Sequence, residues 1–430
     1  MHTKLSDTPS SSSIRSAEST IRLTLFGLIA LCVSLVAVTT WINHLLDSRI
    51  ARETPAPQTT KDATSGSDGR NGNTGAPWGD LVTIDIDIEQ PMEYVSFEET
   101  VKQTASWVFT GKSHSQTRAL MIDAGLTAGQ SDAALTVKNV DDTASATIVK
   151  PDDALILEMT PEVRAKLYAT MAQWPENRLM CWPYHLELSR CEALFKKNGI
   201  PPTTVALIKK LLYSRGGFEY FSDVELVLRS IPTADGRSAL LKALTYQKAV
   251  LTRLSLNSDT DIDKLVGYWC SVPGVRAKDL RPLLESIKNS PDGGTISLLY
   301  LLPPFARERL FTFPLPSKPG DPKMDCHWTA LNFFNEVPDD RLQDNDYAGK
   351  FIQEHLYTIG KPSMCGDLVF LLDHNGAVIH SAVYIADDIV FTKNGINFAQ
   401  PWILMRMKNL LGAYTGMEEP RAVYYRRKEV

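Results

Sequence analysis

A single uninterrupted apolar segment limits what this chain can fold into more than any other feature. Residues 23–46, LTLFGLIALCVSLVAVTTWINHLL, contain no Asp, Glu, Lys or Arg. About 20 helical residues are enough to cross the hydrocarbon core of a bilayer. Arg22 precedes the segment and Trp41 lies near its end, and both residue types are typical of membrane interfaces. We therefore predict a transmembrane anchor over 23–46, with a cleaved signal peptide and a buried core helix as alternatives.

The segments on either side of the predicted anchor are polar. Residues 1–22 form an N-terminal tail, and residues 47–80 are rich in Thr, Gly, Ser, Pro and Asp, a composition that predicts a flexible linker. Lys and Arg are balanced across the segment, so the positive-inside rule does not decide its orientation. Because a short tail precedes the segment, we expect a single-pass protein of an inner membrane with its C-terminal part outside the cytoplasm.

Charge and cysteine content exclude several classes of protein. The net charge of −5 is spread along the chain and no nucleic-acid-binding motif is visible, so we expect no nucleic-acid partner. Six cysteines in 430 residues are too few for a disulfide scaffold. Cys181 and Cys191 leave a disulfide open in an oxidising compartment, or with His185 a zinc site, although core packing explains them more simply. We expect no cofactor, and the sequence does not indicate the oligomeric state.

The middle of the chain divides into two predicted regions. Residues 81–159 open with LVTIDIDIEQ, whose alternation predicts a strand with a wet acidic face, and continue with a helical segment and three strand-like runs. We interpret 81–159 as a small mixed α+β unit. Residues 160–312 carry helical spacing and helix-start signals, such as Thr160 followed by Pro161, and predict a mainly helical region.

A proline-rich stretch at 313–323 introduces the C-terminal unit, residues 313–430, and a helix predicted to begin near Asp325 follows it. Cys326, Thr329 and Ala330 then share one face with Phe333, and Cys326 heads that face. The first-turn N–H groups and the helix dipole lower the pKa of a thiol placed there, and the same N–H groups can hold an oxyanion. Cys326 is therefore a candidate nucleophile, with a buried structural cysteine as the alternative.

A predicted strand hairpin supplies the base that such a thiol needs. GDLVFLL, AVIHSAVYI and IVFTKNG each predict a strand, and His380 lies inside the second one among apolar neighbours. A three-residue loop at 386–388 places His380 opposite Asn394, with Thr392 its diagonal neighbour on the same face, whereas a two-residue loop brings Lys393 there instead. We favour Asn394 as the residue that orients the ring, with Thr392, or a turn role for Asn394, left open.

The order of these motifs resembles the NlpC/P60 family of papain-fold cysteine peptidases. MDCHWTALNFF, GDLVFLL and HSAVYIADDIVF correspond to the family's cysteine helix and following strands, over about residues 315–425. The resemblance implies a papain-like domain, Cys326 as nucleophile, His380 as base, and peptides of the bacterial cell wall as substrate. His327 and Trp328 replace the family's Ser and Gly, the upstream aromatic motif is missing, and the third catalytic residue is not obvious.

The sequence thus predicts an α+β protein with a transmembrane helix, a mixed and then mainly helical middle region, and a papain-like domain. Its predicted function is thiol-dependent hydrolysis of an amide bond, in which His380 takes the thiol proton and later donates it to the leaving amine. A catalytically inactive binding or scaffold module is the alternative. A zinc site built from Cys326 and His380 with His327, Cys365 and His374 is a further alternative, although the spacing fits no compact zinc motif.

Overall fold

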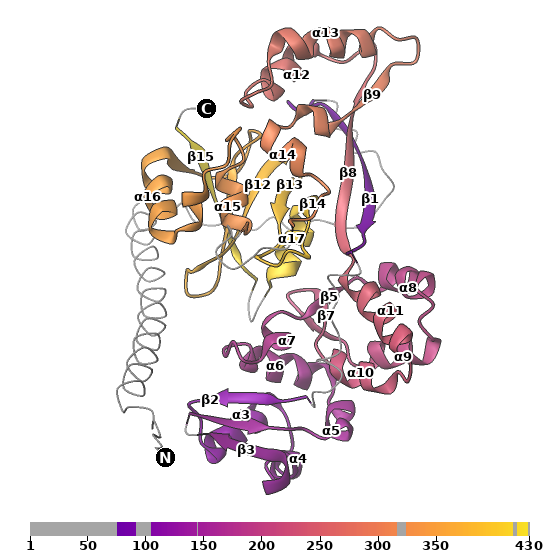
Figure 1. Ribbon diagram of the computed structural model, residues 1–430, viewed down its shortest axis with the longest axis vertical. Helices are drawn as coiled ribbons and strands as arrows, with labels where there is room; N and C mark the ends of the chain where they lie inside the picture. Colours follow the sequence, from indigo (N-terminus) through magenta and orange to yellow (C-terminus); the bar gives the residue numbers. More distant parts are fainter. Residues whose placement is uncertain (1–74, 92–104, 144, 316–323, 416–418, 429–430) are drawn as a thin grey trace, which may run out of the picture. The chain divides into compact units, whose positions relative to one another are not determined.

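The computed structural model describes residues 75–91, 105–143, 145–315, 324–415 and 419–428. Within these ranges the chain forms four β-sheets with helices between their strands (Figure 1). The segment predicted to span a membrane, residues 23–46, lies outside them. No helix in the described ranges has the length and apolar character that crossing a bilayer requires.

The largest sheet has six strands in the order β10-β15-β11-β12-β13-β14. Their bounds are Leu356–Ile359 (β10), Leu368–Leu372 (β11), Val378–Ala386 (β12), Ile389–Lys393 (β13), Trp402–Arg406 (β14) and Arg421–Arg427 (β15). Its associated helices are α15 (Cys326–Leu331), η4 (Asp340–Gln343), α16 (Asn345–His355) and α17 (Met407–Tyr414). Strands β11 and β13 are buried at every position, so the continuous apolar runs that predicted them reflect burial on both faces.

A second sheet, of order β1-β8-β9, joins segments far apart in the sequence. Its strands are β1 (Asp80–Ile88), β8 (Gln247–Leu256) and β9 (Gly294–Ser297). β1 pairs antiparallel with β8 along its whole length, from Asp80 opposite Ser255 to Ile88 opposite Gln247 (Figure 1). Ala249 of β8 is buried in the same hydrophobic cluster as Val369 and Ile403 of the six-stranded sheet. The strand predicted at 81–90 is therefore present, but it belongs to a sheet that packs against the C-terminal strands.

Two small sheets and most of the helices make up the remaining middle region. The sheets are β2-β4-β3, with strands Trp107–Thr110, Ala146–Val149 and Val140–Thr143, and β5-β7-β6, with strands Tyr184–Leu186, Phe218–Phe221 and Tyr213–Arg215. The helices before β8 are α3 (His114–Ala124), α4 (Ala128–Ala134), η2 (Val137–Asn139), α5 (Asp153–Glu158), α6 (Pro161–Met171), α7 (Arg178–Cys181), α8 (Leu188–Lys197), α9 (Pro202–Lys210), α10 (Val224–Ser230) and α11 (Ala234–Thr245). After β8 come α12 (Ile262–Trp269), α13 (Ala277–Lys288), η3 (Leu298–Leu301) and α14 (Pro304–Arg309).

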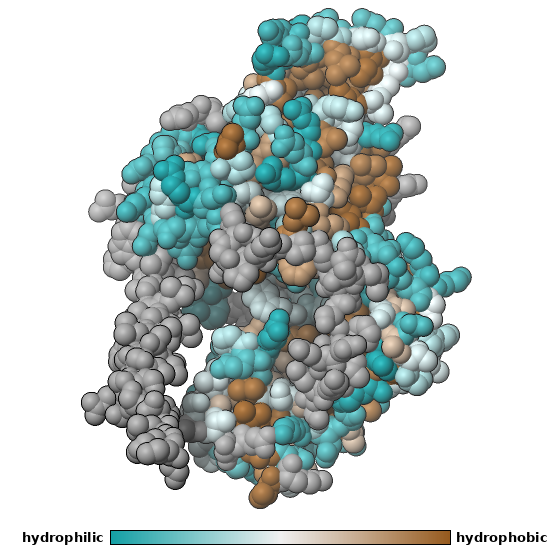
Figure 2. Space-filling model, viewed as in Figure 1, coloured by the Kyte–Doolittle hydropathy of each residue, from teal (hydrophilic) through white to brown (hydrophobic). Residues whose placement is uncertain are grey.

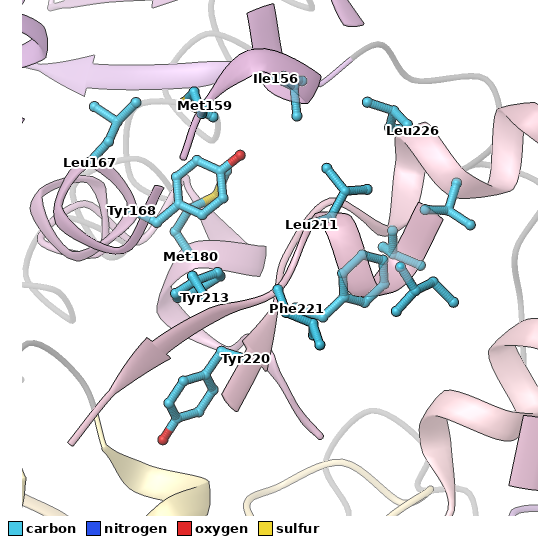
Figure 3. Packing of buried hydrophobic residues seen from close by; sticks show 14 of the residues in the cluster. Ile156, Met159, Leu167, Tyr168, Met180, Leu211, Tyr213, Tyr220, Phe221 and Leu226 are labelled. Atoms are coloured by element: carbon cyan, nitrogen blue, oxygen red, sulfur yellow. The ribbon is translucent and has the colours of Figure 1, made fainter. Parts of the chain in front are cut away.

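The middle region before β8 has a hydrophobic core of its own. Leu167 and Tyr168 of α6, Tyr213 of β6 and Phe221 of β7 are all buried in it. Figure 3 shows these side chains with Ile156, Met159, Met180, Leu211 and Leu226 of the same cluster, whereas Tyr220 points away from them. Elsewhere, hydrophobic surface gathers in Figure 2 near α12 and α13 and along β1 and β8, where Ile84 and Leu283 are among the exposed apolar side chains.

The predicted fold class is wrong, because the described chain is a mixed α/β structure with several sheets and no described helix qualifies as a membrane span. Helices make up most of the region 160–312, but five strands, β5 to β9, also lie within it. The helical spacing over 235–254 ends at Tyr246, where α11 stops and β8 begins, because an apolar run of this kind satisfies both periods. The run ALILEM, predicted as a strand, forms α5.

Candidate active site

Helix α15 presents Cys326 as its first residue. Asp325 is the N-cap, and its carboxylate accepts a hydrogen bond of 2.8 Å from the backbone N–H of Trp328. Thr329 accepts a 3.0 Å hydrogen bond from the indole N–H of Trp402 on β14, which ties the helix to the sheet. Cys326 is only 6% exposed, so its sulfur lies inside the structure at the point where helix and sheet meet.

The β12–β13 hairpin fixes the position of His380. Its turn consists of Asp387 and Asp388, and Asp387 has a φ of 55°. The register shifts between Tyr384 and Ala386, which leaves Ile385 as an extra residue in β12. The hairpin therefore combines a two-residue turn with a bulge. The bulge restores the register that a three-residue loop predicts, with Tyr384 opposite Val390.

In this register Thr392 is the diagonal neighbour of His380 and its hydrogen-bond partner. Nε2 of His380 shares a buried hydrogen bond of 2.8 Å with the Thr392 hydroxyl. The ring is fully buried, and the phenol ring of Tyr414 on α17 stacks on it at 4.1 Å with an interplanar angle of 26°. Nδ1 of His380 is buried and has no hydrogen bond of acceptable geometry in the described structure. That nitrogen is the one that remains open to a reacting group.

Asn394, which we expected to orient the ring, is placed elsewhere. Its side-chain amide nitrogen makes a weak 3.9 Å contact with the sulfur of Met405, and its carbonyl oxygen is buried without a hydrogen bond in the described structure. The structure therefore corrects the expected role of Asn394 in favour of the diagonal neighbour Thr392. Thr392, two residues nearer the turn than Asn394, reaches the ring of His380, whereas Asn394, which lies opposite His380, does not.

The structure also brings His327 to the thiol, a residue that sequence reasoning had considered only as a zinc ligand. Nδ1 of His327 shares a hydrogen bond of 2.6 Å with the hydroxyl of Ser381. Two consecutive residues of α15, Cys326 and His327, thus meet two consecutive residues of β12, His380 and Ser381. The only sequence signal for this contact was a histidine next to the candidate nucleophile.

The charges around Cys326 favour its thiolate. Burial alone would raise the pKa of the thiol, but the charges of His380 and His327 and hydrogen bonding to the His327 ring hold it well below its usual range. Burial lowers the pKa of His327, but the nearby Cys326 and then Asp325 outweigh that effect and raise it to about 9. Because Nδ1 of His380 makes no hydrogen bond in the described structure, we treat its interaction with the sulfur as electrostatic.

This explanation differs from the one predicted from the sequence. We expected the helix start to lower the pKa of the thiol through unpaired N–H groups and the helix dipole. Helix α15 has only 6 residues, and Asp325 already caps the N–H of Trp328 and places a carboxyl group at the helix start. The two imidazoles are the identified causes of the low pKa of Cys326.

A buried lysine adds positive charge near the same site. Lys393 is fully buried, and its ammonium donates hydrogen bonds of 2.7 Å and 2.9 Å to the backbone carbonyls of Gly395 and Asn397. Burial lowers the pKa of Lys393 to about 8, while the charges of Cys326 and Asp325 oppose that shift. Lys393 therefore holds the loop after β13 in place and lies close enough to Cys326 to interact with its charge.

Two other predicted zinc ligands do not join this group. Cys365 is fully buried before β11, and burial raises the pKa of its thiol. His374 lies in the turn after β11. Among the described residues, no three His, Cys, Asp or Glu side chains are grouped so that they would hold a metal ion. Cys181, Cys191, Cys270, Cys326 and Cys365 are all free thiols in the structure.

Comparisons with known proteins found no match: no protein-family model, no curated protein and no solved structure matches the chain.

Proposed function

We propose that this protein is a thiol hydrolase that cleaves an amide bond, with Cys326 as its nucleophile. The observation that supports the proposal most directly is a buried thiol flanked by two imidazole rings, one of which has a nitrogen without a hydrogen-bond partner among the described residues. A thiolate next to an imidazole is the arrangement that nucleophilic catalysis by cysteine requires. The hydroxyl of Thr392 on the far nitrogen of His380 fixes the orientation of that ring.

In the proposed reaction, the sulfur of Cys326 attacks the carbonyl carbon and the carbonyl oxygen becomes an oxyanion. The leaving amine takes a proton from an imidazolium and departs, which leaves a thioester on Cys326. Water then hydrolyses the thioester, with an imidazole as general base. The backbone N–H of Cys326 remains our candidate donor to the oxyanion.

The substrate class follows only from the resemblance of MDCHWTALNFF, GDLVFLL and HSAVYIADDIVF to the NlpC/P60 family. On that basis we propose peptides of the bacterial cell wall as the substrate. This proposal agrees with the predicted location outside the cytoplasm, which stays a prediction.

The direct test incubates the full-length protein with soluble cell-wall peptides and follows the release of new amino groups by mass spectrometry. The matched control is Cys326→Ala. Cleavage by the wild type that this variant abolishes supports the proposal. If wild type and variant both leave every peptide intact while iodoacetamide labels Cys326 no faster than an ordinary thiol, the inactive binding module is the better description.

A further inference from the structure

The ring of His380 is held at one edge and on one face by two different elements. Thr392 of β13 shares a hydrogen bond of 2.8 Å with its Nε2, and the ring of Tyr414, at the end of α17, stacks on it at 4.1 Å. The hydrogen bond fixes the Nε2 edge, but the χ2 torsion of a histidine is broad, so the ring remains free to tilt about that bond. The face contact with Tyr414 removes that freedom.

Tyr414 also lies within electrostatic reach of the candidate nucleophile. Burial raises the pKa of its phenol well above the ordinary value, and the charge of Cys326 adds to that rise. The phenol is therefore uncharged near neutral pH. Tyr414 packs against the buried cluster that contains Ile403, Met405 and Leu410. It thus supplies a neutral, fixed ring beside the thiol and the base, which is a role in packing rather than in proton transfer.

The position of Tyr414 depends on the last turn of α17. The final carbonyl groups of a helix have no partner within the helix, and helix ends fray. Here the carbonyl of Leu411 accepts a 2.9 Å hydrogen bond from the hydroxyl of Thr415, and the carbonyl of Gly412 accepts one of 2.5 Å from the phenol of Tyr220. Tyr220 belongs to β7, 192 residues earlier. A side chain of the middle region therefore caps this helix.

The sheet β5-β7-β6 also packs directly against the backbone of α17. A Cβ atom added at Gly412 would lie 2.6 Å from two ring atoms of Phe218 on β7 and 3.0 Å from a ring atom of His185 on β5. These two rings pack edge to face, with their centroids 5.3 Å apart. A Cβ at Gly216, in the turn between β6 and β7, would lie 3.0 Å from the methyl group of Thr415. The sheet and the helix end thus approach each other closely at both glycines.

We propose that Tyr414 is a positioning residue for His380 and that the sheet β5-β7-β6 of the middle region holds Tyr414 in place. This inference rests on the proposed function, and it gives the middle region a part in the candidate active site. A base acts efficiently only when packing and hydrogen bonds hold it in the reactive orientation. Thr392 supplies the hydrogen bond and Tyr414 supplies the packing.

Alkylation of Cys326 by iodoacetamide between pH 5 and 10 tests the role of Tyr414 without a substrate. Labelling of the full-length protein is counted by peptide mass spectrometry. The midpoint of the pH profile reports the protonation of the thiol, and the plateau at high pH reports access to the sulfur. The charged or titratable groups that act on this thiol are Asp325 and His327 at the start of α15, His380 of β12, Lys393 of β13 and Tyr414 of α17.

We expect Tyr414→Ala to raise the midpoint by at least about one pH unit, because His380, whose charge favours the thiolate most, then loses its fixed position. Tyr414→Phe keeps the ring and should hold the midpoint within about 0.3 of a pH unit of the wild type. An unchanged midpoint for Tyr414→Ala overturns the inference. So does an equal rise for Tyr414→Phe, since the hydroxyl rather than the ring would then be responsible.

Turnover of p-nitrophenyl acetate separates positioning from substrate binding, because this small ester needs no peptide recognition. Tyr414→Ala should lower kcat about tenfold and change KM less than about threefold, and Tyr414→Phe should restore kcat. A loss confined to KM would assign Tyr414 to substrate binding and overturn the inference.

Gly412→Ala tests the part played by the middle region. The new methyl group would collide with the rings of Phe218 and His185, so we expect the end of α17 to shift, the labelling midpoint to rise and kcat to fall at least about threefold. Gly267→Ala is the matched control, since Gly267 lies inside α12 and nothing is within 4 Å of a Cβ added there. Both changes raise helix propensity, so propensity does not explain a difference between them. Equal profiles for the two variants would contradict the role of the sheet.

Tyr220→Phe decides the same point if Gly412→Ala does not fold. It removes only the hydroxyl that binds the carbonyl of Gly412, and we expect a smaller rise of the midpoint in the same direction. A wild-type profile for a folded Tyr220→Phe would then contradict the role of the sheet. A wild-type midpoint near 8.5 would remove the basis of the proposed function itself, whereas a low wild-type midpoint that Tyr414→Ala leaves in place overturns only the role of Tyr414.

Discussion

Two clusters of buried ionisable groups in this chain differ in the chemistry of the groups that they bring together. In the middle region, Arg164 is fully buried, its Nε pairs with the carboxylate of Asp223 at 3.1 Å, and Tyr168 donates a 2.5 Å hydrogen bond to the same carboxylate. Around Cys326, by contrast, a thiol lies beside two imidazoles, and Nδ1 of His380 has no hydrogen-bond partner in the described structure. In the first cluster, which we call the closed cluster, a guanidinium faces a carboxylate, although Nε of Arg164 and Oδ2 of Asp223 form an ion pair without a hydrogen bond. The second cluster instead joins a nucleophile to two bases, and this difference separates a structural cluster from a candidate active site.

The positions of the two clusters agree with this interpretation. Tyr168 points into the core of the middle region among Met159, Met180 and Tyr213 (Figure 3). A second guanidinium nitrogen of Arg164 donates a 2.6 Å hydrogen bond to the carbonyl of Ile156, which further fixes that side chain. The Cys326 cluster instead lies where the start of α15 meets β12 and β13.

The largest effect that we predict is on activity. Cys326→Ala should lower amide hydrolysis by at least about a thousandfold, because the reaction loses its nucleophile. Cys365→Ala is the matched control, since Cys365 is buried and burial raises the pKa of its thiol. Hydrolysis rates of the two purified variants, with their circular dichroism spectra, are the measurement. Equal losses of hydrolysis for the two variants would contradict the assignment of Cys326 as the nucleophile.

The next effect is on stability and concerns the closed cluster. Arg164→Met should lower the free energy of unfolding by roughly 3–5 kcal/mol, because it leaves the buried carboxylate of Asp223 without its cation. Arg118→Met removes an ion pair with Asp132, whose side chains are 40% and 60% exposed, and should lower the free energy of unfolding far less, because solvent screens the pair. Urea unfolding of both variants measures the difference. A loss for Arg164→Met no larger than for Arg118→Met would show that the cluster is not structural.

The closed cluster should also make stability depend on pH. Burial raises the pKa of Asp223 to about 6, although the hydrogen bond from Tyr168 and the charge of Arg164 oppose that rise. Since the folded state then keeps a proton that the unfolded state loses near pH 4, stability falls as pH rises from 4 to 6 and levels off above 6. The predicted fall is about 2–3 kcal/mol. The unfolding temperatures of wild type and Asp223→Asn, plotted against pH across this range, should have different slopes. Parallel plots would refute the raised pKa of Asp223.

The smallest effect separates Thr392 from Asn394. Thr392→Val removes the hydroxyl on His380 and should lower hydrolysis about tenfold, the cost of roughly 1.4 kcal/mol in transition-state stabilisation. Asn394→Ala should change hydrolysis less than twofold, because its side chain contacts Met405 rather than the ring. Comparison of kcat for the two variants tests the assignment, and a larger loss for Asn394→Ala would restore our original expectation.

Local sequence patterns were enough to predict the parts of the site that depend on local structure. Asp325 does cap a helix that begins at Cys326, and apolar runs marked β11, β12 and β13. The hairpin register was derivable as far as placing His380 and Thr392 on one face. The bulge at Ile385 was not derivable, because a bulge and a longer loop give the same register beyond the turn.

The contacts that escaped prediction are those between distant segments. β1 pairs with β8, about 160 residues later, and neither strand has a local sequence signal that identifies its pairing partner. β15 lies inside the six-stranded sheet because the short strand β10, from an earlier part of the chain, pairs with its other side. The contacts of His327 with Ser381 and of Tyr414 with His380 likewise depend on tertiary packing rather than on spacing.

The bulge at Ile385 makes the positions of β12 differ in their tolerance of a deletion. Loss of Ile385 itself would remove the bulge and leave Tyr384 opposite Val390. Side chains alternate between the two faces of a strand, so the loss of one residue between Ser381 and Val383 would turn the preceding part of β12 over. Ile379 would then take the place of His380, and the imidazole would point to the opposite side. Insertions and deletions should therefore be rejected here more strictly than conservative substitutions, a pattern that deep mutational scanning with single-codon deletions would reveal.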